Sequence, residues 1–504
     1  MKLFSLRLTT LKSKLYAIVL ASFVVRVVAF FVLPSTPSSL GPDEGTYGAA
    51  AEWTAQGKSA LDFPDFGADL YVSGRSLLIP AAFFNKLGIS PLDSIRLTSS
   101  LYGLFIICLA TAVALKAASL NKKFKEFIEQ NPHIFFGLFM IFTFLPSHFV
   151  WSILGLRESA AEFWTLSVLI LLFQIEYLKK RITWPSACGF LVSIVMVFSA
   201  RPQVGWVLGA TLILYLTMRK SFHGFKLLLP VALLGILLGY TTTVSSYSEM
   251  ANNFVAVKEA KGVSEIKPQA TTDISEIESN LRLTKKVLKS SSPTPTSRAE
   301  FLASLQCETE NQRIDFQNSI YICHEKSERV VVRNAENPIK AAVKQIEAIP
   351  DHHEVNKVGA ESGIKTLNCP RIGSARVEGY FCIAYRAPYT TFTFLFRPLL
   401  GAEVTSTSSL FAALENVFWL GAAIYIAVMF TRNRRLAFFG AIAPSLLFFS
   451  IYSVAAGAYE GNMGTAFRHK SLILWVVLLL TASTIVATQQ RKSERQGIPG
   501  SSQE

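Results

Sequence analysis

Two adjacent acids, Asp43 and Glu44, stand in the run Gly41-Pro-Asp-Glu-Gly-Thr-Tyr47, shortly after the first apolar stretch of the chain. Pro42 favours a turn, and Asp43 is a suitable N-cap for a helix that begins there. On this interpretation the acids are structural. The alternative interpretation is chemical, because a carboxylate at a membrane surface can accept the proton of an incoming hydroxyl or amine nucleophile. Such a base could meet one substrate from the lipid and another from water.

A set of arginines forms the second chemical pattern, because the expected topology brings them to one level of the membrane. Arginines on the side away from the cytoplasm depart from the usual charge bias of membrane proteins and need a partner. A guanidinium group offers a bidentate fork to phosphate oxygens. Each arginine alone could snorkel or pair with a nearby acid, but the set predicts a site for a phosphate or pyrophosphate group. Its members are Arg75, Arg96, Arg157, Arg201, Arg397 and Arg468, accompanied by Glu158, Glu460, Asn462 and His469.

Other polar positions have weaker interpretations. Arg26 lies within the first apolar run, where it should face the interior of the helix bundle or a wet cavity and could tie this run to an acid on a neighbour. His469 is interpreted as a hydrogen-bonding residue, with roles as an acid, a base or a ligand left open. His352 and His353 lack a convincing set of further ligands, so we predict no metal site there.

The chain is far more apolar than an ordinary soluble protein. Its 504 residues are 51% hydrophobic and 17% charged, with a mean hydropathy of +0.36, whereas soluble domains carry about 25% charged residues. This composition indicates lipid as the solvent. The formal net charge is +14, but the basic residues lie mostly in short loops between apolar runs. There they indicate which loops face the cytoplasm. We therefore expect no nucleic-acid partner.

The apolar runs predict an α-helical polytopic membrane protein with about ten transmembrane helices. The first run, 15–33, is interpreted as a retained anchor because it lacks a convincing small-residue cleavage site. Basic clusters follow every second run, as expected if both termini are cytoplasmic. The later runs are 95–118, 134–153, 159–177, 184–200, 204–218, 227–245, 409–430, 437–457 and 470–488.

The predicted spans divide the chain into three parts. Residues 1–245 form an N-terminal membrane core, and its first outer loop, 34–94, carries the acidic motif and two helices along the membrane surface. Residues 246–408 form an extracytoplasmic segment that includes a small α+β domain. Residues 409–504 form a C-terminal membrane part with three spans and a cytoplasmic tail.

The cysteines are unevenly distributed. Cys108 and Cys188 lie in apolar runs and are interpreted as packing residues. The other four lie in the polar segment, which predicts two disulfides in an oxidising compartment. Among the three possible connectivities we favour near neighbours, Cys307 with Cys323 and Cys369 with Cys382.

The arrangement resembles the GT-C class of membrane glycosyltransferases, which contains protein O-mannosyltransferases and aminoarabinose transferases. The resemblance begins with Arg26 in the first span, Asp43-Glu44 and Tyr47 in a long first outer loop, and Arg96 at the start of the next span. Further along, Arg157-Glu158, Arg201 and the run Asn462–His469 resemble motifs of bacterial members that build surface polysaccharides. The last run also resembles Wzy-type polymerases. The resemblance covers the membrane core and excludes residues 246–385.

This resemblance implies a donor sugar carried on a polyprenyl phosphate, used at the outer face of the bacterial inner membrane. Asp43 would be the general base, with Glu44 as its alternate or its support. The acceptor hydroxyl would attack the anomeric carbon, usually with inversion. The leaving phosphate would bind Arg201, Arg468 and Arg157.

From the outer level that the topology gives them, together with this resemblance, we predict a set of substrate-binding residues: Tyr47, Arg75, Glu158, Arg397, Glu460, Asn462 and His469. The acceptor could be a glycan, a lipid or a protein, because the long insertion before the last spans departs from the family pattern. Members of the class differ in metal use, so a divalent metal remains open and no cofactor is assigned.

Two alternatives stay open from the sequence. One is a Wzy-like polysaccharide polymerase or ligase whose donor is a lipid-pyrophosphate oligosaccharide. The other is a transporter of a lipid-linked sugar, for which internal symmetry and broken helices near the bilayer midplane are expected. The sequence shows neither feature, and a purely structural scaffold would not explain the outer arginines.

Overall fold

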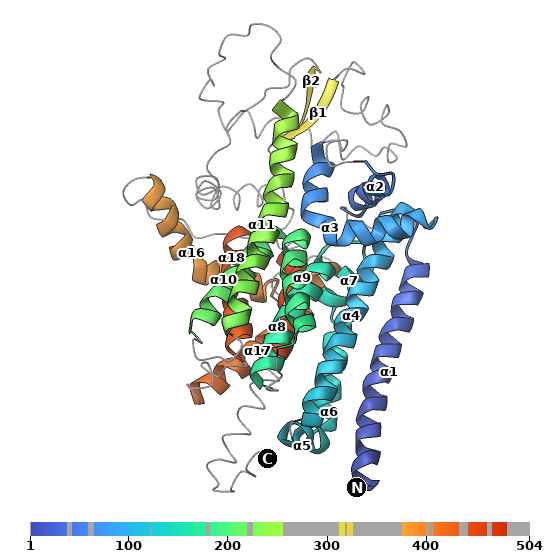
Figure 1. The fold of residues 1–504 in the computed structure, drawn as a ribbon, viewed down its shortest axis with the longest axis vertical. Coiled ribbons are helices and arrows are strands. Elements are labelled where there is room, and N and C mark those ends of the chain that lie inside the picture. Colours follow the sequence, from blue (N-terminus) through green and yellow to red (C-terminus); the bar gives the residue numbers. More distant parts are fainter. Residues whose placement is uncertain are drawn as a thin grey trace. The chain divides into compact units, whose positions relative to one another are not determined.

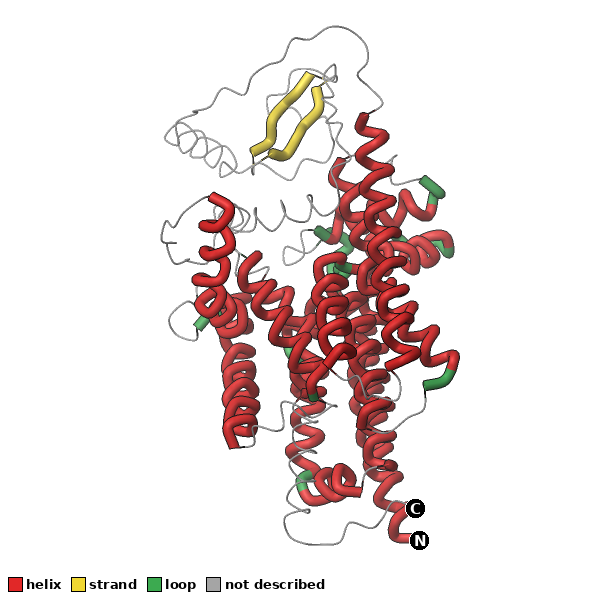
Figure 2. The backbone as a smooth tube through the Cα atoms, turned by 60° about the vertical axis from the view of Figure 1, so that its left-hand side comes forward, coloured by secondary structure: helices red, strands yellow, loops and turns green. Residues whose placement is uncertain are grey.

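The computed structural model of this chain is almost entirely helical over the residues it describes, and strands occur there in one hairpin (Figure 2). The described residues are 2–37, 43–58, 65–120, 122–177, 182–218, 225–255, 312–317, 320–325, 375–399, 404, 407–432, 442–460 and 466–480.

Four described helices are long and apolar enough to cross a membrane, and a bent pair provides a fifth candidate. A helix satisfies its backbone hydrogen bonds internally, which is the requirement for crossing a bilayer. Helices α1 and α4 pack along each other in the bundle (Figure 1). The protein is therefore an α-helical, multi-pass membrane protein. The four long helices are α1 (Lys2–Val32), α4 (Pro91–Leu120), α8 (Glu158–Tyr177) and α17 (Thr407–Arg432).

The bent pair consists of α6 (Pro132–Phe144) and α7 (Pro146–Ile153), which meet at an angle of 41°. Leu145 between them has a ψ of 135°, because a proline at the next position disfavours helical backbone in the residue before it. The sequence predicted an unbroken span at 134–153. That prediction was wrong in this respect, and so was the statement that broken helices are absent.

Several other apolar helices are shorter than the about 20 residues that a span needs. Arg201 between α9 and α10 is extended, and Pro202 begins the next helix. The expected total of about ten transmembrane helices stays a prediction. The shorter helices are α9 (Trp184–Ala200), α10 (Pro202–Met218), α18 (Ala443–Tyr459) and the apolar stretch 227–242 of α11 (Phe225–Val255). A further helix covers residues 466–480, and the rest of the predicted last span lies outside the described residues.

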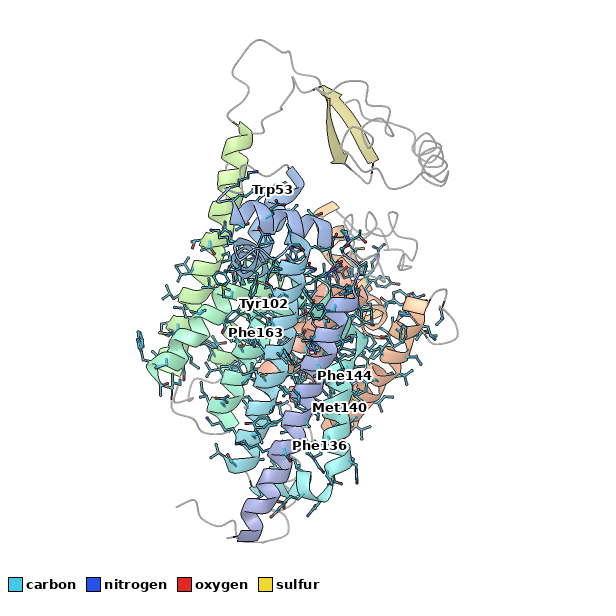
Figure 3. The ribbon with its side chains drawn as sticks, turned by 90° about the vertical axis from the view of Figure 1, so that its right-hand side faces the viewer. Trp53, Tyr102, Phe136, Met140, Phe144 and Phe163 are labelled. Atoms are coloured by element: carbon cyan, nitrogen blue, oxygen red, sulfur yellow. The ribbon has the colours of Figure 1, made fainter. Side chains whose placement is uncertain are left out.

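Helices α2 (Glu44–Ala55) and α3 (Asp65–Lys86) pack against each other and against α4. They lie beside the C-terminal end of α1, at what we call the α2 end of the bundle (Figure 1). The Tyr102 hydroxyl of α4 donates a hydrogen bond to the Ser76 carbonyl of α3 at 2.8 Å. The Tyr102 ring also lies 5.6 Å from that of Phe163 on α8, and both residues are labelled in Figure 3. Residues 44–47 are therefore carried on a packed helix, and Asp43 lies directly before it.

A buried polar network ties α1 to α7 and α8. Arg26 donates to the Ser152 hydroxyl at 3.0 Å, and its Nη2 lies 3.2 Å from His148 Nε2. The other ring nitrogen, His148 Nδ1, lies 3.1 Å from a Glu162 oxygen. Arg26 therefore faces the bundle interior as expected, and it is linked to an acid of a neighbouring helix through a histidine. Gly103 makes room for this contact, because a Cβ there would lie 2.5 Å from Ser152 Cβ.

A second buried network holds the N-terminal end of α7. The Ser147 amide donates to Glu415 of α17 at 2.8 Å, and the Trp419 indole donates to the same carboxylate at 2.9 Å. The first amides of a helix have no partner within the helix, so Glu415 acts as a cap supplied by another helix. Lys470 is fully buried beside it and donates to Asn416 at 2.6 Å.

Residues 251–336 form a compact unit separate from residues 1–250 and 337–504. Within it, β1 (Gln312–Gln317) pairs with β2 (Ile320–Glu325) in an antiparallel hairpin that places Cys323 opposite Ile314. Cys382 is buried on α16 (Ala375–Phe396), which packs on α17 and α18. Cys307 and Cys369 lie outside the described residues. The disulfide pairing and the α+β domain remain predictions.

Candidate active site

Asp43 lies directly before α2 and makes no side-chain capping bond to that helix. Its carboxylate instead accepts a hydrogen bond from Arg468 Nη1 at 2.9 Å, across 425 positions of sequence. The Asp43 side chain is 46% exposed and that of Arg468 is 18% exposed. The first of the two adjacent acids is therefore accessible and faces an arginine from the last described helix.

Arg468 contacts a second acid behind the first. Its Nε lies 3.0 Å from an oxygen of Glu158, which begins α8 and is 1% exposed. The same Glu158 oxygen accepts a hydrogen bond from Arg201, at the break between α9 and α10. One carboxylate thus joins two arginines that are 267 positions apart in the sequence.

Arg157 and Tyr47 complete this group, which we call the arginine–carboxylate cluster: Asp43, Tyr47, Arg157, Glu158, Arg201 and Arg468. Arg157 interacts electrostatically with Tyr47, Arg201, Glu158 and Arg468. Burial lowers the pKa of Arg157, and the nearby Arg201 and Arg468 lower it further. Burial raises the pKa of the Tyr47 hydroxyl. Tyr47 therefore contributes a neutral phenol to the cluster.

The charges of the cluster favour an anion. Three guanidinium groups, those of Arg157, Arg201 and Arg468, face the carboxylates of Asp43 and Glu158, so the cluster taken without the neighbouring Glu460 carries one more positive than negative charge. Arg201 Nε is buried and makes no hydrogen bond within the described part of the chain. Buried polar atoms without partners are uncommon in native proteins. A phosphate group would supply both the missing charge and further acceptors.

Glu44 occupies a different environment from Asp43. It is fully buried, and both its oxygens accept hydrogen bonds from Arg96 at 2.9 and 3.0 Å. Its Oε1 also accepts the Gly155 amide at 3.1 Å. Arg96 in turn donates to the carbonyl of Pro34 at 2.6 Å. These contacts favour the supporting role for Glu44, because they tie the start of α2 to α4 and to the turn before Arg157.

Glu460 and His469 form a buried pair next to the cluster. A Glu460 oxygen contacts His469 Nδ1, and both side chains are nearly inaccessible to solvent. The pKa of His469 is lowered mainly by burial and further by Arg201. Glu460 therefore orients a neutral imidazole whose Nδ1 carries the proton.

The structure places the remaining predicted site residues as follows. Arg75 lies half-buried on α3. Arg397 follows α16, and its carbonyl accepts a hydrogen bond from Lys470 at 3.1 Å. Asn462 lies outside the described residues.

Sequence analysis missed the buried polar residues inside the bundle, chiefly His148, Glu162, Glu415 and Lys470. Each is an ionisable residue within or beside an apolar run, which is itself a recognised indication of a partner inside the membrane. In the described part of the chain, no group of three or more His, Cys, Asp or Glu side chains could hold a metal ion. Metal dependence stays open.

Comparisons with known proteins add little to this geometry. No protein-family model and no curated protein sequence matches the chain. Among solved structures, the chain is similar to the crystal structure of ArnT from Cupriavidus metallidurans in the apo state. The identity is 16% and the TM-score is 0.34, over 93% of this chain and 77% of that chain. A likeness this distant assigns no activity and no site residue.

Proposed function

We propose that the protein is a membrane glycosyltransferase of the GT-C class that transfers a sugar from a polyprenyl phosphate to a glycan, lipid or protein acceptor. The observation that supports this proposal most strongly is the arginine–carboxylate cluster. It combines an accessible carboxylate with three arginines drawn from distant parts of the chain. A base beside a phosphate site is the arrangement that this reaction needs.

The reaction can be written on these residues. The acceptor hydroxyl attacks the anomeric carbon, and its proton passes to Asp43. The bond between that carbon and the phosphate oxygen breaks, and its electron pair stays on the phosphate. Arg157, Arg201 and Arg468 bind the phosphate as its charge increases. Attack from the side opposite to the leaving phosphate inverts the configuration.

The charge balance of the cluster suits this step. A donor phosphodiester carries one negative charge, and the three arginines of the cluster offer it N–H donors. During transfer the phosphate gains a negative charge while Asp43 loses one by protonation. The net charge of the loaded site therefore does not change, which keeps the electrostatic cost of the reaction low in a poorly solvated site.

The proposed setting is the outer face of the bacterial inner membrane, where both lipid-linked donor and acceptor are available. The distribution of basic loops supports this orientation, because it assigns the end of the bundle that carries Asp43 to the side away from the cytoplasm.

Asp43→Asn tests the proposal with release of free polyprenyl phosphate as the readout. We expect turnover to fall about 100-fold or more, the usual contribution of a general base, while the protein still binds the donor. Glu52→Gln on the same helix is the matched control and should retain full turnover. Unchanged product formation by Asp43→Asn would show that the base is assigned wrongly. Mass spectrometry of co-purified lipid would identify the donor.

Transport of a lipid-linked sugar is the second candidate, and the break between α6 and α7 favours it. A transporter moves the lipid across the membrane without breaking the bond between sugar and phosphate. The same release assay therefore separates the two candidates.

A further inference from the structure

Arg468 contacts two carboxylates through different atoms. Its Nη1 binds Asp43 at 2.9 Å on the more accessible side, and its Nε faces Glu158 at 3.0 Å on the buried side. Glu158 is also bound by Arg201, so it is well fixed. Glu158 therefore holds Arg468 on the buried side, and Asp43, which is about half exposed, contacts Arg468 on the accessible side.

The outward contact competes with both roles in the proposed reaction. Arg468 occupies Asp43 Oδ2, which leaves Oδ1 for the proton of an acceptor hydroxyl. One N–H of Arg468 Nη1 is likewise directed at Asp43 and must turn away from it before it can bind a phosphate oxygen. A guanidinium group has five N–H donors in a fixed plane, so Arg468 can exchange one outward partner for another while its Nε stays with Glu158.

We propose that Arg468 couples donor binding to the base. Without donor, Arg468 holds Asp43. When the donor phosphate binds, it takes over the outward N–H groups of Arg468, and both oxygens of the Asp43 carboxylate become free for the acceptor. Donor binding then increases the ability of Asp43 to activate the acceptor. This inference rests on the proposed function and adds this coupling to it.

The exchange predicts an unusual result for Asp43→Asn. The substitution removes the carboxylate that competes with phosphate for Arg468, so phosphate should bind more tightly to the variant than to the wild-type protein. An ion pair of this exposure contributes about 0.2–1 kcal/mol, so we expect an affinity gain of about 1.4- to fivefold. Structural damage would weaken binding instead, and this difference in sign distinguishes the two explanations.

The test measures binding of farnesyl phosphate to the full-length protein in nanodiscs, with farnesol as the control for the lipid chain. Glu52→Gln removes the same charge from α2 without touching Arg468 and should leave the affinity unchanged. The gain should also vanish when Asp43→Asn is made in an Arg468→Gln background.

Each outcome of the test decides the proposal. A gain of about 1.4- to fivefold that Glu52→Gln does not share and that requires Arg468 supports the exchange. Unchanged or weaker binding by Asp43→Asn overturns it, and so does an equal gain in Glu52→Gln, which would reflect general charge. If wild-type protein binds farnesyl phosphate no better than farnesol, the proposed function fails together with the exchange.

Discussion

Glu158 holds two arginines with one carboxylate, in a position almost closed to solvent. A buried acid of this kind is stable when its charge is compensated, and here Arg201 at the break between α9 and α10 and Arg468 on the last described helix compensate it. The same contacts bring both guanidinium groups close enough to act on one ligand. Glu158 thus determines the spacing of the arginines that we assign to the donor phosphate.

Glu158→Gln tests whether Glu158 holds Arg201 and Arg468 in place. The amide keeps the shape but removes the charge, so Arg201 and Arg468 lose the anion that they share. Breaking a buried ion pair in this way costs about 3–5 kcal/mol, and we expect a loss of this size in the free energy of unfolding together with a large loss of turnover. Denaturant unfolding of the purified protein measures the first quantity. Glu52→Gln should differ from wild type by less than about 0.5 kcal/mol, and equal stability of both variants would contradict the assignment.

At the scale of elements, α7 links the bundle interior to the site. Glu415 caps its N-terminal end, and Arg26 contacts His148 and Ser152 along its face. Beyond the C-terminal end of α7, the Gly155 amide donates a hydrogen bond to Glu44 at the start of α2. A short helix fixed at both ends can therefore hold the turn that precedes Glu158.

Gly103→Ala should disturb α7 from the side of α4. The new methyl group would lie 2.5 Å from Ser152 Cβ and 3.1 Å from Arg26 Nη2, so the helices must separate or the network must break. Overpacking of this kind costs about 1–3 kcal/mol, which thermal unfolding would detect. Gly137→Ala on α6 is the matched control, because nothing lies within 4 Å of its added Cβ. That variant should be as stable as wild type or slightly more stable. A neutral Gly103→Ala would contradict the tight contact.

At the scale of the whole molecule, the predicted topology indicated which distant residues lie close together. The local sequence pattern did not indicate which side chains pair with each other. The alternation of basic loops predicted Asp43, Arg201 and Arg468 at one membrane level. In the structure Arg468 contacts both Asp43 and Glu158, and Glu158 also binds Arg201. Neighbours in the sequence do not reveal that Glu44 is buried against Arg96, because the two are 52 positions apart. The break before Pro146 was missed because a proline can begin a helix as readily as it can interrupt a span.

Orientation in the membrane is the last requirement of the proposed reaction. Lys12 and Val32 are 20 residues apart on α1, which corresponds to about 30 Å along the helix, the thickness of a hydrocarbon core. Glu52 lies on α2, at the other end of the bundle from Lys12. In intact cells, a membrane-impermeant maleimide should therefore modify Glu52→Cys. It should modify Lys12→Cys only after the cells have been permeabilised. The labelling of the parent protein is the baseline for both variants. Modification of Lys12→Cys from outside, or of both from the same side, would place Asp43 and Arg468 away from an outer-leaflet donor. The proposed sugar transfer at that face would then be wrong.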